Sequence, residues 1–421
     1  MRLPLTAAQL LVWHQQQLDL TNPINNVGEY VELRGPLELD LLVSAVDRGV
    51  ADTDTMNVRF VEEGDQVWQV VEAASENTPP VVDLRCADDP MGRARQWMRE
   101  RLDRPFDLTA GPTSCMAVLM LAADHHLLFL AAHHIALDGC SGSLLIRRIC
   151  EIYNELLVGK PVSERPYQGL DAVIAEERRY HGSARYTADR EYWLKALADG
   201  PLEVPVTGRC APVSHHSLSE AGSLPADKAN ALRALAGEAR VTVSTVMMAA
   251  AGLYVHRVAG VRDVLLSVPV TGRKGSRARN VPSMVMNCLP LRLRIEPHMP
   301  TRELLRQTFH QARDLLRHER YQDFARDLDL GDAAYQQCGL EINYMAFDYD
   351  MRFGDADTVV HTLSTGYVDD LAISVYDRQR DGSLRILMNA NPALYQQEDL
   401  REHLRQFLRL VESLETPVLL D

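Results

Sequence analysis

The sequence lacks the features that mark several large classes of protein. Among its 421 residues no apolar run is long enough to cross a membrane, and no apolar N-terminal segment precedes a cleavage site. Positive charge is also scarce, because 44 Lys and Arg stand against 58 Asp and Glu, for a net charge of −14. This balance disfavours binding to nucleic acid or to an anionic membrane surface, since both need a basic face. We therefore expect a cytoplasmic protein with no nucleic-acid or membrane partner.

Cysteine is sparse and follows no pattern. The 7 cysteines are odd in number and include no CxxC pair, so the sequence predicts reduced thiols and no disulfide framework. Motifs of common chemistries are missing as well. The absence of GxSxG disfavours a serine hydrolase. The absence of GxGxxG, and of GxxxxGK followed by Ser or Thr, leaves dinucleotide and nucleoside triphosphate binding unsupported.

The chain is too long for one ordinary core, so two lobes of about 200 residues each are expected. Strands that follow one another directly indicate a mixed α/β (α+β) fold and not a regular βαβ array. A polar stretch over 161–200 predicts the connection between the lobes, which we place at 1–175 and 176–421. The expected strands are 27–33, 58–61, 67–71, 114–121, 126–135, 263–270, 339–346, 369–377 and 383–390. The expected helices are 6–20, 37–50, 90–102, 141–157, 226–239, 242–259, 301–320 and 397–414.

The run His133-His-Ile-Ala-Leu-Asp-Gly139 is the strongest chemical signal in the chain. It follows the apolar stretch 127–132, which is typical of a buried strand, and precedes the start of a predicted helix. Imidazole exchanges protons near neutral pH, so this position suits general acid–base chemistry. Adjacent strand residues point to opposite faces, so one of the two His should face a core and the other a site. A His on a buried strand is also commonly a satisfied core residue.

The spacing of the His residues argues against a metal centre. His126 and His134 would share a face of a regular strand, but eight residues separate them by about 26 Å. Metal ligands must lie about 2 Å from the ion. The sequence therefore predicts no metal site, and direct group transfer remains, with one substrate as nucleophile and His as base or orienting group.

Several motifs in order resemble those of the condensation domains of nonribosomal peptide synthetases, in the chloramphenicol-acetyltransferase-like superfamily. The resemblance covers the chain nearly end to end. Besides HHxxxDG, it rests on five segments: Leu5-Thr-Ala-Ala-Gln9 with Trp13, Arg104-Pro-Phe-Asp-Leu108, Tyr192-Trp193, Ser267-Val-Pro-Val-Thr-Gly-Arg273 with Asn287-Cys-Leu-Pro-Leu-Arg292, and Asn389-Ala-Asn-Pro392.

This resemblance implies two acetyltransferase-like lobes in a V-shaped pseudo-dimer, with a tunnel between them and crossover segments near 281–296 and 361–385. It implies that His134 is catalytic, that His133 and Asp138 are structural, and that Asp138 pairs with an arginine, for which Arg273 is the first candidate. Gly139 would permit close backbone approach at the site. A solvated loop charge is the alternative for Arg273.

The departures from the family pattern bear on the substrate. Thr53-Asp-Thr55 resembles the variant of starter-type domains, which accept an acyl group instead of a peptide. The stretch 285–290 also departs from the usual run. Met284 and Met286 would give an adaptable lining for an acyl chain beside Asn287, or plain core packing. Cys140 replaces a frequent aromatic residue and would widen the tunnel, unless the change is neutral.

The family joins a carrier-bound acyl thioester to the amine of a carrier-bound amino acid. The resemblance thus implies a donor acyl carrier protein and an acceptor peptidyl carrier protein as partners. It implies no directly bound cofactor, since both substrates ride on 4′-phosphopantetheine, and we expect a monomer. Three alternatives stay open: an ester-forming acyltransferase with an alcohol acceptor, a non-catalytic recruitment domain of the same fold, and an epimerase relative. The intact HHxxxDG run disfavours the recruitment domain, and Thr-Asp-Thr disfavours the epimerase.

Overall fold

The structure is a computed structural model that describes residues 1–73, 78–198, 204–214, 216–276, 278–323, 327, 339–345, 351–377 and 381–414. Its helices are α1 (Ala7–Gln17), α2 (Leu39–Ala51), η1 (Asp54–Asn57), α3 (Pro90–Leu102), α4 (Gly139–Leu157), α5 (Leu170–His181), α6 (Ala184–Leu197), α7 (Ala226–Ala239), α8 (Val243–Ala259), α9 (Thr301–Arg317) and α11 (Gln397–Ser413). Its strands are β1 (Arg2–Pro4), β2 (Asn26–Arg34), β3 (Val58–Glu63), β4 (Gln66–Val71), β5 (Val81–Asp83), β6 (Ser114–Ala122), β7 (His125–His133), β8 (Leu218–Leu224), β9 (Asp263–Val270), β10 (Asn287–Arg294), β11 (Leu340–Met345), β12 (Asp357–Thr365), β13 (Leu371–Tyr376) and β14 (Leu384–Ala390).

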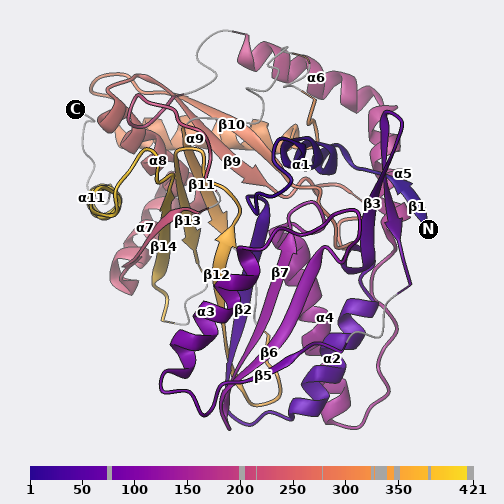
Figure 1. The fold of residues 1–421 in the computed structure, drawn as a ribbon. Coiled ribbons are helices and arrows are strands. Elements are labelled where there is room, and N and C mark those ends of the chain that lie inside the picture. The colour runs from indigo at the N-terminus through magenta and orange to yellow at the C-terminus, as the bar shows by residue number, and fades with distance from the viewer. Residues whose placement is uncertain are drawn as a thin grey trace. The chain divides into compact units, whose positions relative to one another are not determined.

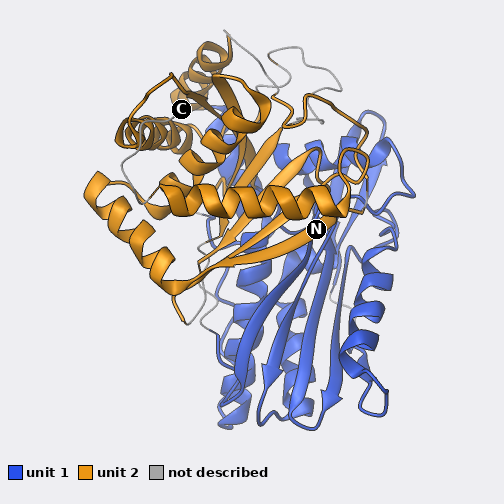
Figure 2. Cartoon of the chain, turned by 90° about the vertical axis from the view of Figure 1, so that its left-hand side faces the viewer, with its two compact units in different colours: residues 1–182, 275–285, 349–366 blue, residues 183–274, 286–348, 367–421 orange. Residues whose placement is uncertain are grey.

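The chain forms two compact units (Figure 2). Unit 1 comprises residues 1–182, 275–285 and 349–366, and unit 2 comprises 183–274, 286–348 and 367–421. Each unit is therefore assembled from three separate stretches of chain. The two-lobe division made from the sequence stays a prediction, as do its crossover segments.

Unit 1 is built on a sheet with strand order β12-β2-β7-β6-β5 (Figure 1), accompanied by the small sheet β1-β4-β3. Helices α2 and α4 pack on one face of the larger sheet, where Val31 and Leu33 join Leu145 and Ile149 in one core. Helix α3 covers the other face, where Phe129 is fully buried. Because both faces are covered, β7 carries an unbroken apolar run in place of the usual alternation.

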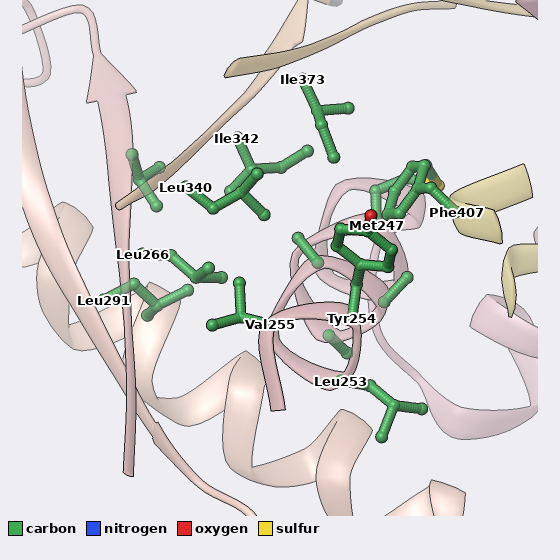
Figure 3. Packing of buried hydrophobic residues seen from close by; sticks show 14 of the residues in the cluster. Met247, Leu253, Tyr254, Val255, Leu266, Leu291, Leu340, Ile342, Ile373 and Phe407 are labelled. Carbon is green, nitrogen blue, oxygen red and sulfur yellow. The ribbon is translucent and has the colours of Figure 1, made fainter. Parts of the chain in front are cut away.

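Unit 2 is built on a sheet with strand order β10-β9-β11-β13-β14-β8. Its core lies between one face of this sheet and helices that include α8 and α11. Figure 3 shows Leu266, Leu340 and Ile342 from the strands turned toward Val255 of α8. Alternate strand residues must then point away from this core.

The mixed α/β organisation predicted from the sequence is confirmed, and most predicted elements lie within a few residues of the observed ones. The elements that were not predicted include α5, β8, β10 and β12, besides the short β1, η1 and β5. The sequence of β8, Leu-Ser-Glu-Ala-Gly-Ser-Leu, is poor in strand-forming residues, so its pairing with β14 overrides local propensity.

Within the described ranges, no single helix is both long and apolar enough to cross a bilayer. Helices α7 and α8 pass that test only as a pair, and the pair is bent by 100°.

Candidate active site

The His pair lies where strand β7 ends and helix α4 begins. His133 is the last residue of β7, and the backbone N–H of His134 donates to the carbonyl of Asn25 over 2.7 Å. The chain then turns through three residues to Asp138, the N-cap of α4. The two imidazoles consequently have different surroundings: His133 is 1% exposed, whereas His134 is only half-buried.

His133 is fixed as a neutral, fully hydrogen-bonded ring. Its Nδ1 accepts the backbone N–H of Ile135 over 3.2 Å, so Nε2 carries the proton and donates to Gln16 Oε1 over 2.9 Å. The amide of Gln16 is oriented in turn, since its Nε2 donates to the carbonyls of Asp19 and Asn22. Burial, and next to it the neighbouring His134, lower the pKa of His133 to about 3. This ring therefore serves the geometry of the site and does not exchange protons at neutral pH.

His134 has the properties of a base. Its Nδ1 is enclosed and has no hydrogen-bond partner among the residues that the structure describes, which leaves Nε2 as the accessible ring nitrogen. Burial lowers the pKa of His134, while the Asp138 carboxylate and the carbonyls of 134 and 137 oppose that shift. The imidazole is thus neutral at physiological pH and able to accept a proton.

Gly366 also approaches this ring. Its φ is +95°, which favours glycine, and a Cβ placed there would lie 3.7 Å from His134 Cδ2. The sequence alone does not reveal this residue, because it follows β12, far along the chain from the His pair.

Asp138 holds the start of α4 and a distant segment together. One carboxylate oxygen accepts the backbone N–H of Ser141 over 2.9 Å, and the other accepts the N–H of Val285 over 3.2 Å. The hydroxyl of Ser141 lies 2.7 Å from the carbonyl oxygen of Ser283 and accepts the N–H of Ser283. Asp138 is 3% exposed, so its observed contacts are those of a structural anchor.

The other predicted residues of unit 1 lie beside this anchor. Gly139, the first residue of α4, is exposed, and Cys140 is half-buried. The Met284 side chain is buried, and its carbonyl accepts from Thr6 Oγ1 over 3.0 Å. A substrate-binding role for Cys140 and Met284 remains a prediction.

Arg273, Met286 and Asn287 belong to unit 2. The Asn287 amide nitrogen donates to the carbonyls of Glu319 and Tyr321, so only its oxygen is left for a substrate. The Glu319 carboxylate accepts the backbone N–H of Lys274 over 2.8 Å and so holds the loop that carries Arg273. Burial raises the pKa of Glu319, and Lys274, Arg320 and Arg273 oppose that shift. The pairing of Arg273 with Asp138 stays a prediction.

The Thr-Asp-Thr run is occupied by structural contacts. Asp52, the residue before it, accepts from both Nε and Nη2 of the buried Arg148, at 2.9 and 2.7 Å. Asp54 pairs with Arg165 and accepts the backbone N–H of Leu170. These carboxylates join α2, α4 and the approach to α5. Within the described ranges no group of three or more His, Cys, Asp or Glu is arranged to hold a metal ion.

A neutral His at the strand–helix junction, next to a fully hydrogen-bonded His133 and an anchoring Asp138, fits an acyltransferase of the chloramphenicol-acetyltransferase-like fold. Comparison with known proteins identifies the family. The model of the Condensation domain family matches residues 1–417. The chain therefore belongs to the condensation domain family of nonribosomal peptide synthetases, and it is an amide-forming acyltransferase.

Among curated relatives, the dimodular nonribosomal peptide synthase of Bacillus subtilis (strain 168) is 36% identical over 411 residues, which are 97% of this chain and 17% of the relative. The isonitrile lipopeptide synthase of Streptomyces coeruleorubidus is 38% identical over 402 residues, 95% of this chain and 27% of the relative. The chain thus spans less than a third of the length of either protein.

The similar solved structures include starter and first condensation domains. A variant of the starter condensation domain of rhizomide synthetase RzmA in complex with C8-CoA has a TM-score of 0.92 and 32% identity, covering 100% of this chain and 97% of that one. The first condensation domain of the calcium-dependent antibiotic synthetase, in complex with a substrate analogue, has a TM-score of 0.91 and 30% identity, covering 99% and 97%. The predicted mixed α/β fold and the predicted family are confirmed.

Proposed function

We propose that this chain catalyses the starter step of a nonribosomal assembly, in which an acyl group is transferred from a donor acyl carrier to an aminoacyl acceptor carrier. The amine nitrogen attacks the thioester carbonyl, the new C–N bond forms and the C–S bond breaks. The donor carrier leaves as a thiol, and the proton lost by nitrogen ends on the departing sulfur. Each carrier presents its substrate on phosphopantetheine, and the chain works as a monomer in the cytoplasm.

The observation that carries this proposal is the state of His134: neutral, half-buried, with Nδ1 enclosed and Nε2 accessible. Such a ring can take the proton of the attacking amine and pass it to the thiolate. An α-amine has an ordinary pKa of about 7.7–8, so some ten per cent is already unprotonated at neutral pH. Positioning the amine against the thioester then contributes more to the rate than removing its proton does. Positioning can lower the barrier by about 7–11 kcal/mol, whereas general acid–base catalysis typically speeds a reaction by about 10²–10⁴-fold.

The choice of an acyl donor is supported by the neighbours. The similar rhizomide synthetase domain is a starter domain in complex with C8-CoA, and one curated relative is a lipopeptide synthase. The Thr-Asp-Thr run contributes less than its motif suggested, because Asp54 is paired with Arg165. We therefore rest the starter assignment on the relatives rather than on that run.

The decisive experiment mixes the chain with acyl carriers of graded chain length and three acceptors: a glycyl carrier, free glycine and a free alcohol. Intact-protein mass spectrometry of the acceptor carrier reports the product. We expect acylation of the carrier-bound amine, a rate about 10²-fold lower for His134→Ala, and a wild-type rate that falls as acid protonates His134. Because burial lowers the pKa of His134, that loss begins at a lower pH than for an ordinary histidine.

The matched control is His14→Ala, which removes an exposed imidazole from α1. It should turn over like the wild type. Unchanged turnover by a folded His134→Ala variant would remove His134 as the base. Product only with the free alcohol would replace the amide assignment with an ester-forming one, and no product with any acyl carrier would overturn the starter step.

A further inference from the structure

Helix α9 of unit 2, labelled in Figure 1, carries a row of exposed basic side chains along its whole length. Another side of the helix packs against α8 and β10. Residues three or four positions apart lie on the same side of an α-helix. The exposed basic residues follow this spacing without a break and form what we call the basic face: Arg302, Arg306, His310, Arg313 and Arg317.

Helix α11 of the same unit gives a matched comparison. It also has 17 residues, but its three arginines stand against four acidic residues. Arg401 forms an ion pair with Glu398, and Arg405 forms one with Glu402. The positive charges of α11 are therefore neutralised within the helix itself, as is usual for a solvated helix face.

The charges of α9 are not balanced in this way. Its four arginines stand against two acidic residues, in a chain whose net charge is −14. Within the part of the chain that the structure describes, no hydrogen bond or ion pair engages the side chain of Arg302 or Arg306. Arg313 and Arg317 share the single carboxylate of Asp314, at 3.5 and 3.4 Å. The basic face is therefore a local excess of positive charge on a negative molecule, and it attracts an acidic partner that the rest of the surface repels.

A cavity of about 430 Å³ lies beside the middle of the basic face. Arg306 and His310 offer N–H donors there, which suit a carboxylate. Gln307 Oε1 is enclosed and has no hydrogen-bond partner among the described residues, so it offers an acceptor for an N–H group. An acidic peptide supplies both carboxylates and N–H groups, whereas a phosphate supplies acceptors only. The remaining residues that line the cavity are Met299, Glu303 and Gln311.

We propose that the basic face of α9 and the cavity beside it bind an acidic segment of a partner protein. Carboxylates of the segment pair with the arginines, and one of its backbone N–H groups donates to Gln307 Oε1. The inference goes beyond the proposed function, because it concerns unit 2 alone and involves no step at His134. Since the arginines are exposed, salt screens the attraction and weakens the complex.

The test is the binding of an acidic peptide to the full chain at low salt. The 17 residues of α9 span about 26 Å, so an extended peptide of about eight residues covers them. The probe is a fluorescein-labelled peptide of alternating Glu and Gly, and fluorescence anisotropy measures its affinity. We expect the double variant Arg302→Gln with Arg306→Gln to bind about tenfold more weakly, because each exposed ion pair contributes up to about fivefold in affinity.

The matched control is the double variant Arg401→Gln with Arg405→Gln on α11. It removes the same residue types at the same spacing and the same charge, and it should bind the peptide like the wild type. Identical far-ultraviolet circular dichroism shows that both variants are folded. Equal weakening in the two double variants would overturn the inference, because net charge alone would then explain the binding.

Three further results would also overturn it. The first is no binding of the acidic peptide to the wild type. The second is equal binding of an uncharged peptide of alternating Gln and Gly. The third is tighter binding of a short DNA duplex or of phosphatidylglycerol vesicles, which would assign the basic face to phosphates instead of a protein segment.

Discussion

His133 and Arg148 of unit 1 differ from Glu341 of unit 2 in whether their polar atoms are paired. In unit 1, His133 has both ring nitrogens engaged and Arg148 has its guanidinium engaged by Asp52 and Ser163. In unit 2, the shielded carboxylate of Glu341 has no such partner in the described ranges. Paired groups fix geometry, whereas a shielded carboxylate without a partner destabilises the folded state when it is charged.

The largest effect is expected at the pair in unit 1. Arg148→Met leaves Asp52 buried without its cation, so the free energy of unfolding should fall by about 3–5 kcal/mol. Urea denaturation of the full chain measures it. The double variant Asp52→Leu with Arg148→Met removes both charges and should recover most of the loss. If Arg148→Met lowers the free energy of unfolding by less than about 1 kcal/mol, as the loss of a surface ion pair would, the pairing of Arg148 with Asp52 does not stabilise the fold as expected.

An intermediate effect is expected at His133, and it depends on pH. The pKa of His133 is about 3 when folded, against 6.5 ordinarily. The unfolded chain therefore takes up a proton at this residue first, and stability is lost as pH falls from 6.5 toward about 3. Between these two pKa values, His133 makes the free energy of unfolding fall by about 1.4 kcal/mol for each unit that the pH falls. His133→Gln should lack that slope in denaturation at successive pH values, and parallel curves for the two proteins would refute it.

The smallest effect is expected at Glu341 and has the opposite sign. Burial raises its pKa from 4.5 to about 7, so the folded chain holds a proton that the unfolded chain releases earlier. The contribution of Glu341 to the free energy of unfolding is fully present below pH 4.5 and is lost as the pH rises toward about 7. Melting temperatures at the two ends of this interval should show wild type losing more than Glu341→Gln. A larger loss in the variant would show that the carboxylate has a partner.

Many elements of this fold can be predicted from the sequence because they depend on local patterns. The hairpin of β3 and β4, the apolar run of β7 and the helix after HHxxxDG were all predicted close to their observed positions. The order of strands was not predictable, because it depends on pairings between distant residues. Strand β8 was missed because its Ser, Ala and Gly residues have little preference for a strand.

The residues of the candidate site also differ in whether a local pattern predicts them. His133, His134 and Asp138 are contiguous, so a motif finds them. Gly366 and the backbone of Val285 reach the site only through the tertiary fold, and no pattern near the motif announces them.

Strand β12 pairs along its length with β2, although it lies near the other end of the chain. A fragment ending at residue 182 would leave the hydrogen-bonding edge of β2 bare and would deprive Asp138 of the N–H of Val285. Engineers who exchange unit 1 between such enzymes by cutting at residue 182 should expect insoluble protein. Hybrids that transplant 275–285 and 349–366 together with 1–182 preserve the native pairings.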